Sequence, residues 1–283
     1  MDDAVKVGIK ATTTNAGKVI RLARLMRPDG RTFVATVAHG LLRGPIPDEG
    51  RPIDLGPLAT SLGIAGVDGI VVSPGFLQAN AVYLAGRCAP AIVLCVDWTN
   101  QFRPTDGGLG FSEGRTTTVA SVEDAARLGA DAVMTYLFVG SDDPAVEAEE
   151  VRRNAAVSRR CEELGIVRII ETMARGARVP VDDERKAEYV ALHCRMAYEI
   201  GCDLVKTEWT GDRESFAQVV DACPAPILVA GGPKSSTPSG AVGLAVDAIA
   251  AGAAGVVFGR NIVQAQDPVA VVRAVSAAIH GDQ

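Results

Sequence analysis

The feature that most constrains the fold is an alternation, repeated eight times, between a short apolar run and a longer run rich in alanine and charge. The apolar runs are typical of buried β-strands, and the runs between them are typical of helices. We expect strands at 33–38, 68–73, 91–97, 131–138, 167–173, 203–208, 226–230 and 255–258. We expect helices at 55–65, 76–87, 121–129, 144–164, 183–201, 212–222, 239–252 and 267–280.

Strands that alternate with helices indicate a parallel sheet, and eight of them favour a closed (β/α)8 TIM barrel over an open doubly wound sheet. The 283 residues suit one such barrel, and no linker divides them. We therefore expect a single-domain α/β barrel at 31–283, preceded by an N-terminal extension at 1–30. A helix at 17–26 is expected to cover the barrel bottom. The irregular segment 99–118 should lie at the mouth, where barrel enzymes keep their chemistry.

Charge and hydropathy exclude several classes of partner. The net charge is −6 and no basic run is present, so no nucleic-acid partner is expected. No apolar stretch reaches the roughly 18 residues of a membrane helix, and the N-terminus does not read as a signal peptide. The six cysteines form no CxxC pair, as is typical of reduced thiols. We therefore expect a cytoplasmic protein with no membrane partner.

One lysine lies at a position where it could act as a nucleophile. The chain has six lysines against 22 arginines, and Lys206 lies near the end of the expected strand 203–208. Burial lowers the pKa of a lysine from its ordinary value of about 10.4, and a neutral amine can attack a carbonyl carbon. The position alone leaves two interpretations open. Lys206 is either a nucleophile or the partner of a neighbouring carboxylate at the barrel rim.

The loops after the last two expected strands favour an anion site. Gly231, Gly232 and Lys234 follow one strand, and Gly259 and Arg260 follow the next. Glycines let backbone N–H groups approach an oxyanion, and an arginine adds a charged contact. Barrel enzymes often bind phosphate at these two loops. The pair of loops predicts a phosphorylated small-molecule substrate.

These residues, together with motifs spread over nearly the whole chain, resemble the archaeal-type class I fructose-bisphosphate aldolase family and its transaldolase and thiolase relatives. Each motif is short, but their order and spacing together are specific. The motifs are GKVIRL (17–22), PDGRT (28–32), AHG (38–40), GP (44–45), ASVEDA (120–125), LGADAV (128–133), VGS (139–141), VKT (205–207), TGD (210–212), AGGPK (230–234) and GRNI (259–262). The resemblance implies that Lys206 is the Schiff-base lysine, and that Gly231, Gly232, Gly259 and Arg260 hold phosphate.

Two positions depart from the pattern of that family. Its strand-one motif is Asp-His-Gly, but here Ala38 precedes His39. Its strand-five motif is Trp-x-Tyr-Pro-Arg-Gly, whose tyrosine moves protons, but this chain reads ETMARG (171–176). Met173 cannot exchange a proton. The ordinary acid–base set is therefore incomplete, which weakens the expectation of plain fructose-bisphosphate cleavage.

Two glutamates are candidates for the missing proton transfer. Strand residues two apart share a face, so Glu171 should point into the barrel with Met173, and Glu208 should share the face of Lys206. An inward carboxylate in a site of low dielectric suits proton transfer near neutral pH. We hypothesise that Glu171 does part of the tyrosine's work. The alternative is that Glu171 pairs with Lys206 or Arg175 and only holds position.

Three more residues are candidates at the mouth. His39 is the histidine expected to face it, and we include it in the catalytic set. Asp97 ends the third expected strand and is taken as a substrate contact, with a helix cap as its alternative. Arg175 is taken as a contact for a distal phosphate or carboxylate.

The resemblance implies a Schiff-base, metal-independent aldehyde-lyase that acts on a phosphorylated ketose or related keto compound and needs no cofactor. Three alternatives stay open. They are thiolase-type acyl transfer from a phosphorylated diketone, transaldolase-type transfer, and an inactive barrel that binds sugar phosphates.

The sequence itself argues against two kinds of bound group. Three scattered histidines do not supply a His-rich metal site, and no glycine-rich nucleotide motif follows the first strand. The resemblance also implies a ring-like homo-oligomer, often a decamer.

Overall fold

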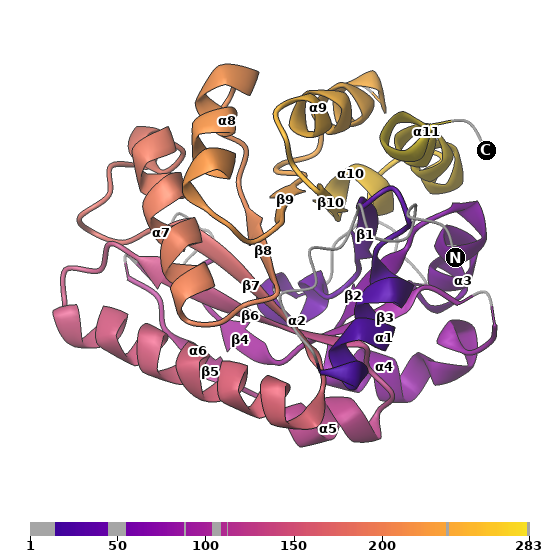
Figure 1. The fold of residues 1–283 in the computed structure, drawn as a ribbon, viewed down its shortest axis with the longest axis horizontal. Coiled ribbons are helices and arrows are strands. Elements are labelled where there is room, and N and C mark those ends of the chain that lie inside the picture. The colour runs from indigo at the N-terminus through magenta and orange to yellow at the C-terminus, as the bar shows by residue number, and fades with distance from the viewer. Residues whose placement is uncertain are drawn as a thin grey trace.

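The computed structural model describes residues 15–44, 55–87, 89–103, 109–111, 113–235 and 238–281, and eight parallel strands close into a barrel within it (Figure 1). The order around the barrel is β1-β10-β9-β8-β7-β6-β3-β2. The strands are β1 (Thr32–Thr36), β2 (Gly69–Val72), β3 (Ala91–Cys95), β6 (Ala132–Val139), β7 (Val167–Ala174), β8 (Leu204–Thr207), β9 (Ile227–Ala230) and β10 (Gly255–Phe258). The expected fold class is confirmed.

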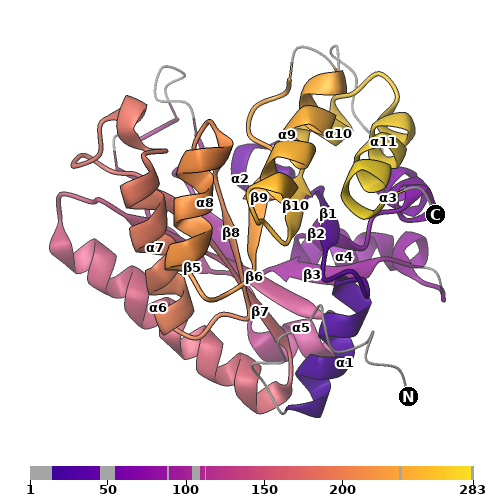
Figure 2. The same cartoon turned by 45° about the horizontal axis from the view of Figure 1, so that its top comes forward.

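An outer layer of helices surrounds the strands (Figures 1 and 2). Side-chain caps define where several of them begin, because Ser121, Asp143, Asp212 and Asp267 each accept a hydrogen bond from a first-turn N–H. The helices of this layer are α3 (Leu55–Ala65), α4 (Pro74–Asn80), η2 (Ala81–Leu84), α5 (Val122–Arg127), α6 (Pro144–Leu164), α7 (Ala187–Glu199), α8 (Arg213–Ala222), α9 (Pro238–Ala250) and α11 (Pro268–His280).

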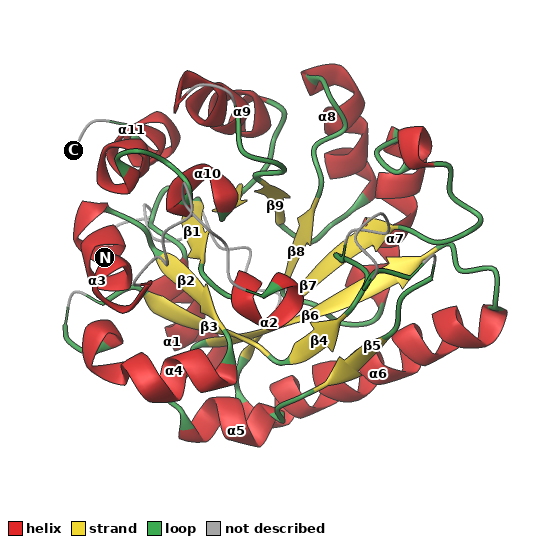
Figure 3. Ribbon diagram, turned by 180° about the vertical axis from the view of Figure 1, so that it is seen from behind, coloured by secondary structure: helices red, strands yellow, loops and turns green. Residues whose placement is uncertain are grey.

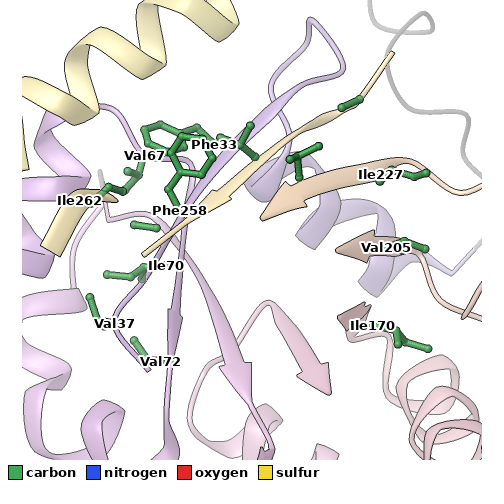
Figure 4. Close-up of a cluster of buried hydrophobic side chains, with 14 of the residues drawn as sticks. Phe33, Val37, Val67, Ile70, Val72, Ile170, Val205, Ile227, Phe258 and Ile262 are labelled. Carbon is green, nitrogen blue, oxygen red and sulfur yellow. The ribbon is translucent and has the colours of Figure 1, made fainter. Parts of the chain in front are cut away.

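Alternate residues of each strand enter two different cores. Val34 and Val257 point into the barrel, whereas Phe33 and Phe258 pack outward against the helices. The two phenyl rings meet edge to face, and their centroids are 5.9 Å apart. Figure 4 shows this outer cluster. The period of two is what pleated strands impose, and it decides which polar side chains reach the barrel interior.

Helix α1 (Ala16–Leu25) closes the barrel bottom. Asn15 caps its first turn, and Leu22 and Leu25 pack with the inward residues of the strands. Two ion pairs hold the helix to the loops that precede strands. Lys18 meets Asp203 at 3.0 Å, and Arg24 meets Asp131 at 2.7 Å. The helix expected at 17–26 is therefore present. Residues 1–14 of the expected N-terminal extension lie outside the described residues.

Five short elements at the mouth were not expected from the sequence. A two-stranded antiparallel sheet of β4 (Asp97–Thr99) and β5 (Thr116–Thr118) occupies the two ends of the segment that we expected to be irregular. The others are α2 (His39–Arg43), η4 (Val181–Asp183) and α10 (Arg260–Val263). Figure 3 shows α2 beside the ends of the strands.

In the described part of the chain, no helix has the length and apolar character to span a bilayer. Of the six cysteines, Cys88 lies outside that part, and the five within it are free thiols.

Candidate active site

A cavity opens at the carboxyl ends of the strands, where residues from seven strands or their following loops meet. Strand ends and α2 supply most of its wall. The lining residues are Thr36, Ala38, His39, Leu42, Arg43, Phe102, Met134, Tyr136, Glu171, Met173, Arg175, Lys206, Glu208, Ala230, Gly231, Gly232, Val257, Gly259 and Arg260. Most of the expected site residues, all except Asp97 and Lys234, therefore share one cavity.

Lys206 points into this cavity because of its place on β8. Leu204, two residues earlier, belongs to the barrel interior, whereas Val205 packs outward. The Lys206 Nζ lies 2.7 Å from Glu171 Oε2, and the two residues are 6% and 7% exposed. Strands β7 and β8 pair Glu171 directly with Lys206, which explains the contact. The lysine and its carboxylate partner thus form a buried ion pair at the cavity wall.

The turn after β9 is shaped so that a ligand can come close. A Cβ at Gly231 would meet the Phe258 ring at 2.7 Å, and Gly232 has a φ of 65°, which favours glycine. The N–H of Gly231 donates to Val257 O, so it is not free to bind an anion. Gly231 can serve an anion site only by leaving room for the ligand, because it has no side chain. The Asn261 amide fixes the turn by donating to Gly231 O and accepting from Ser235 N, both at 2.7 Å.

The turn after β10 leaves even less room. A Cβ at Gly259 would lie 2.5 Å from His39 Nε2 and 2.6 Å from Thr36 Cγ2. Only glycine lets α2 and β10 approach this closely. The contact brings His39 and Arg260 to the same side of the cavity.

Three guanidinium groups line the mouth. Burial lowers the pKa of Arg43, and so does the charge of Arg175. Burial, Arg43 and Arg175 likewise lower the pKa of Arg260. Neither Arg43 nor Arg260 forms an ion pair with a described residue. The mutual repulsion of these cations would be relieved by a bound anion.

Glu208 lies among these cations. Its Oε1 is 3.5 Å from Arg175 Nη2 and 3.6 Å from Arg185 Nε. Its Oε2 and the Nε of Arg175 are buried and form no hydrogen bond with a described group. Both atoms therefore retain capacity for a polar ligand. Arg175 is also held by the Phe102 ring, whose centroid lies 5.3 Å from its guanidinium carbon.

His39 is a neutral imidazole at physiological pH. Burial and the positive charge of Lys206 and Arg260 lower its pKa to about 4. The ring can therefore donate or accept a hydrogen bond near neutral pH, but it does not carry a positive charge there.

Two expected contacts lie away from the cavity. Asp97 is fully buried, forms an ion pair with Arg153 and accepts a hydrogen bond from the N–H of Tyr136 at 3.0 Å. Burial raises the pKa of Asp97. Lys234 is exposed and borders a separate pocket near α9 and α11. Neither the substrate contact expected of Asp97 nor the phosphate contact expected of Lys234 fits these positions.

Sequence reasoning missed Tyr136, Arg43 and Phe102 as wall residues. The sequence could have predicted that Tyr136 points inward, because it lies two residues from Met134 and from Phe138 on an expected strand and so shares their face. Arg43 follows the AHG motif on a helix too short to predict.

In the described part of the chain, no cluster of three His, Cys, Asp or Glu side chains could hold a metal ion.

Comparison with known proteins adds an independent finding. A family model described as DeoC/LacD family aldolase matches residues 36–265. An uncharacterized aldolase of Saccharolobus solfataricus is 32% identical over 93% of this chain and 94% of its own length. A 2-amino-4,5-dihydroxy-6-oxo-7-(phosphonooxy)heptanoate synthase of Streptomyces griseus is 33% identical over 92% of this chain and 89% of its own.

Solved structures agree with the sequence comparison. A Schiff-base-forming fructose-1,6-bisphosphate aldolase superposes with a TM-score of 0.78 at 27% identity, and the match covers 92% of this chain and 99% of the other. An archaeal fructose-1,6-bisphosphate aldolase gives a TM-score of 0.79 at 26% identity, over 93% and 99% of the two chains. The resemblance drawn from the motifs is confirmed.

Proposed function

The chain belongs to the DeoC/LacD family of aldolases, and from that membership we propose that it is an aldehyde-lyase in which Lys206 forms a Schiff base with a phosphorylated keto substrate. One observation carries the proposal. Lys206 is buried and lines the same cavity as the two glycine turns. Its Nζ lies 2.7 Å from the Glu171 carboxylate, which can remove its proton. The membership supports an aldolase-type enzyme, and the cavity supports the assignment of its residues.

The ion pair suits the first half of the reaction. Glu171 takes a proton from the Lys206 ammonium, and the neutral amine attacks the ketone carbon to give a carbinolamine. Glu171 returns that proton to the carbinolamine hydroxyl, which leaves as water. The iminium ion that remains on Lys206 withdraws electrons from the neighbouring bond.

The second half of the reaction breaks a carbon–carbon bond. Glu171, again a carboxylate, takes the proton of the substrate hydroxyl that becomes the aldehyde. The electron pair of the broken bond moves into the iminium and gives an enamine. Protonation of the enamine carbon and hydrolysis then release the second product and free Lys206.

We place the phosphate of the substrate at Gly231, Gly232, Gly259 and Arg260. Gly231 and Gly259 have no side chain that would fill the space beside the phosphate. Arg260 contributes a guanidinium that forms no ion pair with a described acidic residue. We assign a second anionic group of the substrate to Arg175, with Arg43 beside it. Glu208 keeps Arg175 oriented and offers an unused oxygen to a substrate hydroxyl. The neutral imidazole of His39 forms a hydrogen bond with the substrate on the side of its phosphate.

The test is the cleavage of phosphorylated ketoses, assayed by the release of an aldehyde. Lys206→Arg keeps the positive charge beside Glu171 but cannot form the imine, so we expect turnover to fall on the order of 10⁴-fold. Glu171→Gln should lower kcat by roughly 100-fold or more, as removal of a general acid–base group does. Wild-type turnover by the Lys206→Arg variant would refute the proposal.

One observation favours a second candidate function, acyl transfer from a phosphorylated diketone to a thiol carrier. Met173 lines the cavity where the resembled family has a proton-transferring tyrosine. Turnover that requires coenzyme A would support acyl transfer, and aldehyde release without coenzyme A would support the lyase.

A further inference from the structure

One polar part of the cavity wall is a row of three side chains on adjacent strands. Register pairs Tyr136 of β6 with Glu171 of β7, and Glu171 with Lys206 of β8. Paired residues of a parallel sheet point to the same face, and all three line the cavity. A phenol, a carboxylate and an amine therefore stand side by side in one layer of the barrel.

On the side away from β7, the backbone of Tyr136 is held by side chains instead of by strand β3. The last β3–β6 pair is Cys95 with Met134, so Tyr136 lies just beyond it. The N–H of Tyr136 donates to Asp97, and its C=O accepts from Arg153 at 2.7 Å and Asn154 at 2.8 Å. These buried polar groups keep the residue in place where the pairing of β6 with β3 has ended.

The ring of Tyr136 is fixed as firmly as its backbone. It stacks on Phe138 with ring centroids 5.8 Å apart and meets Phe102 edge-on at 5.4 Å. A fixed ring gives its hydroxyl one defined position in the cavity wall, which proton transfer requires.

The hydroxyl of Tyr136 keeps its own proton available. It accepts a weak hydrogen bond from the Cys95 thiol at 3.7 Å, and it donates to no described residue. Burial raises the pKa of Tyr136 well above its ordinary value, and the negative charge of Glu171 adds to the effect. The phenol is therefore neutral and holds its proton near neutral pH.

The other titratable groups of the cavity are already engaged or approach it from the opposite wall. Glu208 is bound by Arg175 and Arg185, and Glu171 is bound by Lys206. His39 follows β1, which stands opposite β7 in the barrel, and lies against the Gly259 turn. Tyr136 is the neutral donor beside the lysine and its carboxylate.

We propose that Tyr136 is the catalytic acid that delivers the proton to the enamine carbon on Lys206. This role rests on the proposed Schiff-base function. Glu171 receives the proton of the substrate hydroxyl as the carbon–carbon bond breaks. Tyr136 gives its O–H proton to the enamine carbon, which restores the iminium, and the phenolate takes the proton held by Glu171. Protons and electrons balance without any further reactant.

Hydrogen exchange separates this role from a structural one. The wild-type enzyme, incubated with dihydroxyacetone phosphate in D2O, should exchange a hydrogen next to the ketone for deuterium, as followed by proton NMR. Tyr136→Phe keeps the stacked ring and removes only the hydroxyl, so exchange should slow by about 100-fold. The adduct trapped on Lys206 by borohydride should stay within a factor of about two of wild type, since imine formation uses Glu171. Tyr198→Phe makes the same change on α7, outside the cavity, and should exchange at the wild-type rate.

Three results would overturn the assignment. Exchange by Tyr136→Phe at the wild-type rate would show that the phenol is not the donor. An equal loss of trapping and exchange in that variant would show that the phenol only shapes the site. Failure of the wild-type enzyme to trap an adduct with dihydroxyacetone phosphate or any other phosphorylated ketone would refute the Schiff-base function itself, and the role of Tyr136 with it.

Discussion

Lys206 and Glu171 are costly residues to bury, and the proposed Schiff-base chemistry would explain why they are there. Most other inward side chains of the barrel are apolar. A buried ion pair gives up hydration that its mutual attraction only partly restores, so apolar residues of similar volume often stabilise a core at least as well. The pair is therefore expected to serve catalysis rather than stability.

Double substitution tests this view of the ion pair. Lys206→Met leaves Glu171 buried without its partner and should lower the free energy of unfolding by about 3–5 kcal/mol. Adding Glu171→Met should recover most of that loss, although the enzyme stays inactive. Urea unfolding followed by circular dichroism measures both. A double variant as unstable as the single one would show that the pair holds the fold together.

Gly259 gives a second prediction at this scale. A methyl group there would overlap His39 and Thr36, so Gly259→Ala should push α2 from β10 and raise KM for a phosphorylated ketose by roughly tenfold, about 1.4 kcal/mol of lost binding. Gly243→Ala, in α9 with open space around it, is the matched control and should leave KM unchanged. Equal KM values for the two variants would contradict the anion site.

Residue patterns predicted much of the site but not all of it. Lys206, Glu171, Gly259 and Arg260 stood out because strand ends of a barrel converge on one face. Asp97 was assigned to substrate because the sequence does not show that β3 ends at Cys95, which turns the Asp97 carboxylate toward Arg153 instead of the cavity.

At the scale of elements, α1 closes the bottom of the barrel through one apolar face. Leu25 is fully buried on that face, whereas Ile20 is 64% exposed on the other. Leu25→Ala should therefore cost about 2–5 kcal/mol, and Ile20→Ala should stay within about 0.5 kcal/mol of wild type. Thermal and urea unfolding of the two variants provides the comparison. Similar losses for both would mean that α1 does not plug the barrel.

The elements of the repeated strand–helix alternation were predictable and the extra ones at the mouth were not. The eight strands were predictable as apolar runs in that alternation, although four of them have only four residues, and α6 was predictable from its 21 residues. In contrast, α2 has five residues, and β4 and β5 have three each, so pairing with distant segments decides their form. Arg43 and Phe102 were missed for this reason.

At the scale of the whole molecule, His280 connects the last helix to the barrel bottom. Its ring nitrogens lie 2.7 Å from Asp29 and 3.1 Å from Asp68, in the loops before β1 and β2. Burial alone would lower the pKa of His280, but the hydrogen bonds to Asp68 and Asp29 raise it overall. The first and last parts of the described chain are thereby joined by one titratable side chain.

This contact predicts how stability changes with pH. Because the folded pKa of His280 is raised, its contribution is complete below the unfolded pKa of about 6.5 and is lost as the pH rises through the folded value. His280→Asn should therefore cost more free energy of unfolding at pH 6 than at pH 9. Urea unfolding at the two pH values checks this. An equal cost at both would exclude the charged contact.

Two expectations about the whole molecule stay predictions, namely the ring-like homo-oligomer and the cytoplasmic location. The barrel itself followed from the eightfold alternation, because parallel strands joined by helices have few ways to bury both faces.

Borohydride reduction followed by peptide mass mapping tests most directly whether Lys206 becomes covalently linked to substrate. We expect a mass increase that depends on a phosphorylated ketone, lies on the peptide containing Lys206 and is absent from the Lys206→Arg variant. An adduct on another lysine, or no adduct with any phosphorylated ketone, would contradict it.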